Sequence, residues 1–121
     1  MTTRRLKTYS AQTGYVYQYY FVGVRASLPG APAAPADEYV FDATWDGRAV
    51  FAVSVFLPAA ALAGWSSAHG RALTGSEQYA AAKLRLLRGF EEMEAPAIGA
   101  RQLIIGTEHL EELLAELRLD E

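Results

Sequence analysis

The sequence predicts a single α+β domain, residues 1–121, in which an antiparallel meander of three to four strands packs with about three helices in the order β-β-β-β-α-α-β-α. Residues 15–25 are aromatic or apolar at almost every position of a strand-like run. Asp46-Gly47 separates two further strand-like runs and is a strong hairpin signal. Two later segments carry apolar side chains at helical spacing. The length of 121 residues, with 51% hydrophobic and 21% charged, suits one globular domain.

The first two strands are predicted at residues 6–10 and 15–25, with a turn at residues 12–14. The second run holds four of the seven tyrosines. One layer of helices covers only one face of a sheet, so this run predicts that a second layer or a partner covers the other face. The alternation places Tyr15, Tyr17, Tyr19 and Phe21 on one face, and Val16, Gln18, Tyr20, Val22 and Val24 on the other.

A hairpin is predicted next, after a connector rich in Pro, Ala and Gly at residues 27–37 that is expected to form a surface loop. Its strands are expected at residues 38–45 and 48–57, joined by the two-residue turn Asp46-Gly47. That turn would place Trp45 opposite Arg48 and Phe41 opposite Ala52. Large rings on one strand would then meet small side chains on the other.

Three helices and one more strand complete the prediction. Pro58 suits the first turn of a helix that ends near Gly70, and Thr74 with Glu77 forms a capping box before a long helix that Pro96 ends. Residues 101–106 predict a short strand, and Thr107 is expected to cap the last helix. The expected buried stripes are Tyr79, Ala80, Lys83, Leu84, Leu86, Leu87 and Phe90 in the long helix, and Leu110, Leu113, Leu114 and Leu117 in the last.

Charge and cysteine content bear on partners and compartment. The net charge is −3, but residues 1–25 carry four cations and no acid, whereas the segment from Thr107 onward carries six acids and one cation. These two segments are expected to pair with each other, within a subunit or across a dimer. The chain has no cysteine and no signal-peptide pattern, and Pro58 with many alanines argues against a membrane span at residues 49–68. A cytoplasmic protein is therefore expected.

Three segments resemble known catalytic or metal-binding motifs, but each lacks a residue that the motif requires. Residues 64–68 resemble a nucleophile elbow but end in alanine, and residues 70–77 have phosphate-loop glycines with Ser76 in place of the lysine. Residues 42–53 begin like a calcium loop but end in valine. The two histidines, His69 and His109, have no metal-ligand spacing. The sequence therefore predicts no catalytic residue, metal site or cofactor, and it leaves open whether the chain is an enzyme.

Three groups of side chains are candidates for binding. Tyrosines near the N-terminal cations could stack bases, Trp45 beside Arg48 could clamp a cation–π ligand, and Trp65, His69 and Arg71 could line a pocket. We favour a non-enzymatic protein-interaction or binding module that forms a homodimer, with the tyrosine face as interface or pocket wall. The alternatives are a small-molecule-binding domain or modest enzyme and a single-stranded nucleic-acid-associated protein, although the negative net charge argues against nucleic acid. The candidate residues are Tyr15, Tyr17, Tyr19, Trp45, Arg48, Trp65, His69 and Arg71.

Overall fold

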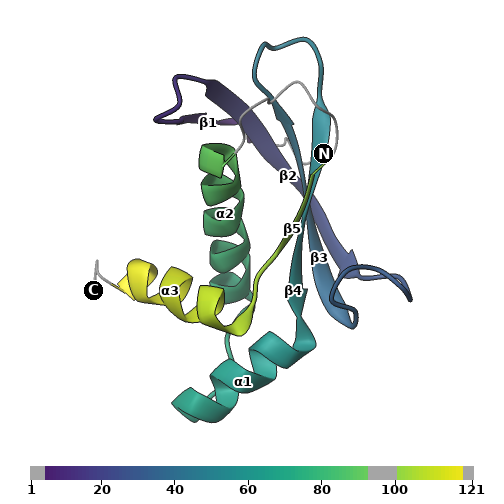
Figure 1. The fold of residues 1–121 in the computed structure, drawn as a ribbon, viewed down its shortest axis with the longest axis vertical. Coiled ribbons are helices and arrows are strands. Elements are labelled where there is room, and N and C mark those ends of the chain that lie inside the picture. The colour runs from purple at the N-terminus through teal and green to yellow at the C-terminus, as the bar shows by residue number, and fades with distance from the viewer. Residues whose placement is uncertain (1–4, 93–100, 119–121) are drawn as a thin grey trace.

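The computed structural model describes residues 5–92 and 101–118, and within them the fold is α+β with the predicted element order (Figure 1). Five strands form one sheet, and three helices pack beside it. The strands are β1 Lys7–Ser10, β2 Val16–Ala26, β3 Ala36–Thr44, β4 Phe51–Pro58 and β5 Arg101–Ile104. The helices are α1 Ala59–His69, α2 Gly75–Glu92 and α3 Thr107–Arg118.

The sheet has the order β1-β2-β3-β4-β5. The first four strands form the predicted antiparallel meander. The fifth strand, expected only as a short separate segment, joins the same sheet beside β4 and runs parallel to it. A parallel neighbour requires a crossover, and α1 and α2 supply it. The sheet therefore has one strand more than the predicted meander.

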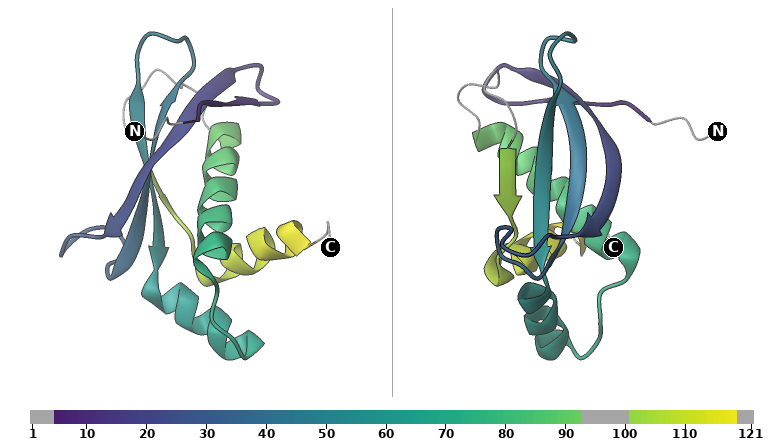
Figure 2. Two further views of the ribbon diagram at one scale, coloured as in Figure 1. Left: turned by 180° about the vertical axis from the view of Figure 1, so that it is seen from behind. Right: turned by 90° about the vertical axis from the view of Figure 1, so that its right-hand side faces the viewer.

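The helices lie on one side of the sheet (Figures 1 and 2). The core forms between that side and α2 and α3, where apolar side chains of the strands meet those of the helices. The largest fully buried side chains include Tyr17, Phe41, Trp65, Leu86, Phe90 and Leu110. The other side of the sheet has no helix over it within the described residues. This one-sided cover determines which faces of the strands can meet a partner.

The predicted register of the β3–β4 hairpin is wrong by one residue. Phe41 pairs with Val53 rather than Ala52, and residues 45–50 form a loop longer than two residues. Asp46 organises this loop, because its Oδ1 accepts hydrogen bonds from the amides of Arg48 (2.8 Å) and Ala49 (3.1 Å). The shift turns the apolar side chains of β4 into the core, since a one-residue slip exchanges the two faces of a strand. The buried residues of β4 on the helix side are Phe51, Val53, Val55 and Leu57.

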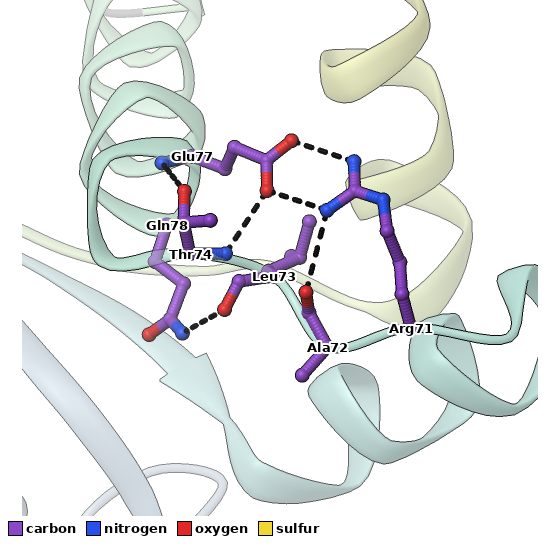
Figure 3. Close-up of polar contacts among 6 residues, drawn as sticks. All are labelled: Arg71, Ala72, Leu73, Thr74, Glu77 and Gln78. Atoms are coloured by element: carbon purple, nitrogen blue, oxygen red, sulfur yellow. Dashed lines mark hydrogen bonds and ion pairs between the residues drawn. The ribbon is translucent and has the colours of Figure 1, made fainter.

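The predicted end of α1 and start of α2 agree with the structure, whereas Pro58 precedes α1 as its N-cap residue and Thr107 is the first residue of α3 rather than its cap. Gly70 ends α1 in the left-handed conformation (φ 71°). The capping box before α2 is present: Glu77 N donates to Thr74 Oγ1 (3.2 Å), and Thr74 N donates to Glu77 Oε1 (2.9 Å) (Figure 3). Pro96, where the sequence predicts the end of the long helix, lies outside the described residues.

The predicted buried stripe is confirmed in α3 and only in part in α2. In α3, Leu110, Leu113 and Leu114 are buried and Leu117 is half-buried, as predicted. In α2 only Leu86 and Phe90 of the predicted stripe are fully buried, and its other five residues are half-buried. Small side chains let α2 approach the sheet closely: a Cβ on Gly89 would lie 2.6 Å from Leu103 Cδ1 of β5. The buried residues of α2 are Ala81, Ala82, Leu86, Gly89 and Phe90.

The acids of α3 pair mainly within the helical layer. Arg88 of α2 contacts Glu112 (3.3 Å) and Glu116 (2.8 Å), and these carboxylates raise the pKa of the Arg88 guanidinium. His69 of α1 contacts Glu111 (2.8 Å). Thus the ion pairs described for α3 join it to α1 and α2. The expected pairing with the N-terminal cations stays a prediction, because Arg4, Asp120 and Glu121 lie outside the described residues. None of the three described helices has the length and hydropathy needed to cross a bilayer.

Candidate functional site

The tyrosine face of β2 forms part of the core. Tyr17 is fully buried, and its ring stacks on Phe90 of α2 with centroids 4.2 Å apart and an interplanar angle of 4°. Tyr19 is 5% exposed and lies 5.8 Å from the same ring, and burial raises the pKa of its hydroxyl. Tyr15 is half-buried at the end of this row. A partner could reach Tyr17 and Tyr19 only after displacement of α2.

Trp45 and Arg48 lie in the loop between β3 and β4. Trp45 is 37% exposed and packs edge-on against Tyr15, with ring centroids 5.8 Å apart. Arg48 is exposed, and its backbone amide bonds to Asp46. Trp45 therefore closes the aromatic row at one end of the sheet.

Trp65, His69 and Arg71 come together at the opposite end of β4. The His69 ring stacks on Trp65 at 4.2 Å and 16°, and the Arg71 guanidinium carbon lies 5.0 Å from the Trp65 ring centroid. Trp65 itself is fully buried. Because β4 runs from the loop that holds Trp45 to α1, it separates Trp45 from Trp65 by the length of a strand (Figure 1). These four predicted residues therefore do not line one shared pocket.

The polar groups beside Trp65 link helices. The Arg71 guanidinium donates to both carboxylate oxygens of Glu77 at 2.8 Å (Figure 3). This pair, with the Thr74 amide, lowers the pKa of Glu77 to about 2. His69 reaches Glu111 on α3. Trp65, His69 and Arg71 thus fix α1, the following turn, α2 and α3 to one another.

The uncovered side of the sheet carries polar residues that the sequence did not single out. Glu38 of β3 is buried, and its carboxylate accepts hydrogen bonds from Arg25 Nε (2.9 Å) and Ser54 Oγ (2.6 Å). The hydrogen bond from Arg25 is the main cause of the lowered pKa of Glu38, and burial opposes it. On the same side of the sheet, the Tyr20 hydroxyl of β2 donates a hydrogen bond to Asp42 of β3 (2.9 Å). A carboxylate held in this way is an ion-pair acceptor and is poorly suited to act as a general base.

The correct register would have revealed this polar network. Ser54 pairs with Val40, so it lies on the same face as Glu38. The predicted register placed Ser54 opposite Tyr39 and therefore on the core face. The polar residues Glu38, Asp42 and Thr44, which lie on one face of β3, could have indicated this network, because they mark a strand with one solvent-facing side.

Exposed aliphatic side chains lie along β2 and just beyond it. Val22 is 37% exposed, Val24 53% and Leu28 68%, and Val16 at the start of the strand is 49% exposed. A register shift between Phe21 and Gly23 marks a bulge against β3. A shallow concavity of about 220 Å³ opens at the bulge, lined by Val22, Gly23, Val24, Arg25 and Val40.

A second concavity, of about 330 Å³, adjoins the first through Arg25. The connector after β2 forms one wall of it, and Glu38, Phe56 and Gln102 of the sheet form another. Within the described residues, no group of three or more His, Asp or Glu side chains is gathered closely enough to hold a metal ion. The uncovered side therefore offers apolar surface and one neutralised ion pair, which are features of a binding surface.

No family model, curated protein or solved structure matches this chain. Its candidate function therefore rests on the geometry above.

Proposed function

We propose that this chain is a non-enzymatic interaction module that forms a homodimer through the exposed end of β2 and the residues just after it. One observation carries the proposal: Val22, Val24 and Leu28, at the end of β2 and just after it, are 37%, 53% and 68% exposed. Exposed aliphatic side chains grouped at one end of a strand mark a candidate interaction surface.

A second copy suits this surface because a two-fold axis uses each contact twice. Burial of the exposed part of each aliphatic side chain contributes roughly 1 kcal/mol, so three residues on each subunit give about 6 kcal/mol in total, which little exceeds the cost of association. Association in the micromolar range, about 8 kcal/mol net, therefore requires further contacts such as backbone hydrogen bonds. The cysteine-free composition suits a reducing compartment, and the proposal places the dimer in the cytoplasm.

The two alternative functions receive less support. A base-stacking surface would need exposed tyrosine rings, whereas Tyr17 and Tyr19 pack against Phe90. A pocket at Trp65 would need space beside the indole, whereas His69 and Arg71 occupy its neighbourhood. The exposed end of β2 is therefore the better candidate for binding.

Sedimentation equilibrium over a wide range of protein concentration tests the proposal. The chain has a mass of 13.2 kDa, and we expect the apparent mass to rise toward twice that value as the concentration passes through the micromolar range. A mass that stays at 13.2 kDa at every concentration would refute the dimer.

A further inference from the structure

The far half of β2 has a free edge. β2 is 11 residues long, and β1 pairs only with its residues 16–19. Arg5 and Leu6, which precede β1, are not in strand conformation. In the described part of the chain, no strand pairs with this edge along residues 21–26. An open strand edge of this length presents backbone donors and acceptors that another strand can use.

The charged side chains along this edge are too few to repel a second strand. Natural edge strands often carry lysines that repel a second strand. Here Arg25 is the one charged residue in the segment, and its guanidinium is engaged by Glu38. Its neighbours Val22 and Val24 are exposed. The edge therefore combines unused backbone groups with apolar side chains and little net charge.

The bulge adds a shape that fits an aliphatic side chain. A Cβ on Gly23 would meet no atom within 4 Å, so the space beside this residue is open. The concavity there, of about 220 Å³, has valines for most of its wall. Strand addition typically combines backbone hydrogen bonds with a pocket for a side chain of the incoming strand, and both elements are present here.

We propose that two copies of the chain pair antiparallel along residues 21–26 of β2, so that the concavity at Gly23 of each copy receives an aliphatic side chain of the other. A second copy fits because an antiparallel pair of identical strands is self-complementary: each copy offers the exposed valines and the concavity that accepts them. The neutral Arg25–Glu38 pair removes the repulsion that like charges would cause. The inference rests on the proposed dimer and assigns its contact surface.

Cross-linking gives the first test. Because the chain has no native cysteine, only the introduced cysteine reacts with a thiol reagent. Val24→Cys and Val16→Cys form a matched pair, because the two valines are 53% and 49% exposed on opposite halves of one strand. With a short bis-maleimide reagent, we expect covalent dimer from Val24→Cys and little from Val16→Cys. Equal yields from the two variants, or a higher yield from Val16→Cys, would overturn the edge assignment.

Charge substitution gives the second test, read as mass by sedimentation. Val24→Lys should weaken dimerisation about tenfold or more, because two ammonium groups would be buried per dimer. Val16→Lys should leave the dimer intact. Circular dichroism and thermal melts of both variants report whether the fold is kept, and we expect them to match the wild type because both sites are exposed.

The outcomes separate this inference from the proposed function. A wild-type chain that is monomeric at every concentration refutes the proposed dimer and the edge pairing with it. A wild-type dimer that Val16→Lys disrupts as strongly as Val24→Lys has a contact that extends beyond residues 21–26, and this overturns the edge pairing alone. A dimer that survives both substitutions uses another surface and also overturns the edge pairing alone.

Discussion

Replacement of Phe90 by alanine tests whether the tyrosine face belongs to the core of one subunit. Phe90 is fully buried on α2. Its ring stacks on Tyr17 at 4.2 Å and lies 6.0 Å from Tyr9 and 5.8 Å from Tyr19. Removal of a buried phenylalanine ring costs about 3–5 kcal/mol, and each aromatic contact contributes roughly 0.5–1.5 kcal/mol beyond the buried area. We therefore expect a loss near the upper end of that range.

Urea unfolding measures this loss, and a thermal melt should show a fall of roughly 10–20 °C for a domain of this size. Val16→Ala is the control, because Val16 is 49% exposed on β2 and lies outside the proposed pairing segment, and its truncation should change stability by about 0.5 kcal/mol or less. If Phe90→Ala instead loses less than about 2 kcal/mol, well below the cost of a fully buried ring, α2 does not cover the tyrosines. The tyrosine face would then return as the candidate interface.

Three further predictions concern the β3–β4 loop, the capping box and nucleic acid. Gly47 has φ 76°, so Gly47→Val should destabilise by about 1–3 kcal/mol in a thermal melt, and a neutral result would show that the loop tolerates another conformation. Arg71 and the Thr74 amide lower the pKa of Glu77 to about 2, so the stability that this carboxylate contributes is present above pH 4.5 and is lost as the pH falls toward 2. Glu77→Gln should therefore be less stable than the wild type at neutral pH, with the gap closing in acid, and a gap independent of pH would contradict this. Labelled single-stranded oligonucleotides should show no rise in fluorescence anisotropy at physiological salt, because Tyr17 and Tyr19 are buried; micromolar binding would restore the nucleic-acid hypothesis.

Local signals predicted helix boundaries well. The Thr74 and Glu77 capping box and the left-handed Gly70 depend on neighbours within a few residues, so the sequence alone specifies them. The place of β5 was not predictable in the same way. Its partner β4 is distant along the chain, and nothing within residues 101–106 states which strand they join.

The hairpin shows how a turn signal can mislead. Asp-Gly predicted a two-residue turn, but the Asp46 carboxylate accepts two backbone amides and stabilises a longer loop. The alternation of Phe51, Val53, Val55 and Leu57 along β4, which the sequence analysis did not use, would have indicated the observed register, because that register buries all of them. Side-chain periodicity was therefore the better guide than the turn dipeptide.

The candidate site was predicted only in part. The sequence placed Val22 and Val24 together on the second face of β2, but the bulge turns Val24 to the face of Tyr39. That a partner covers the second face stays a prediction. The predicted tyrosines belong to the other face, since the helices pack on the bulkier aromatic side. Trp65, His69 and Arg71 were predicted as a group and do meet. These three residues are separated from Trp45 by the length of β4. Residue types alone do not reveal that separation.

Hydrogen exchange along β2 at low and high protein concentration tests the central claim most directly. β1 covers residues 16–19 within one chain, so their amide protection should not depend on concentration. Residues 21–26 should gain protection as the protein becomes concentrated, because a second copy then pairs with their free edge. Protection of residues 21–26 that is the same at both concentrations, in a sample whose mass has doubled, would contradict the account.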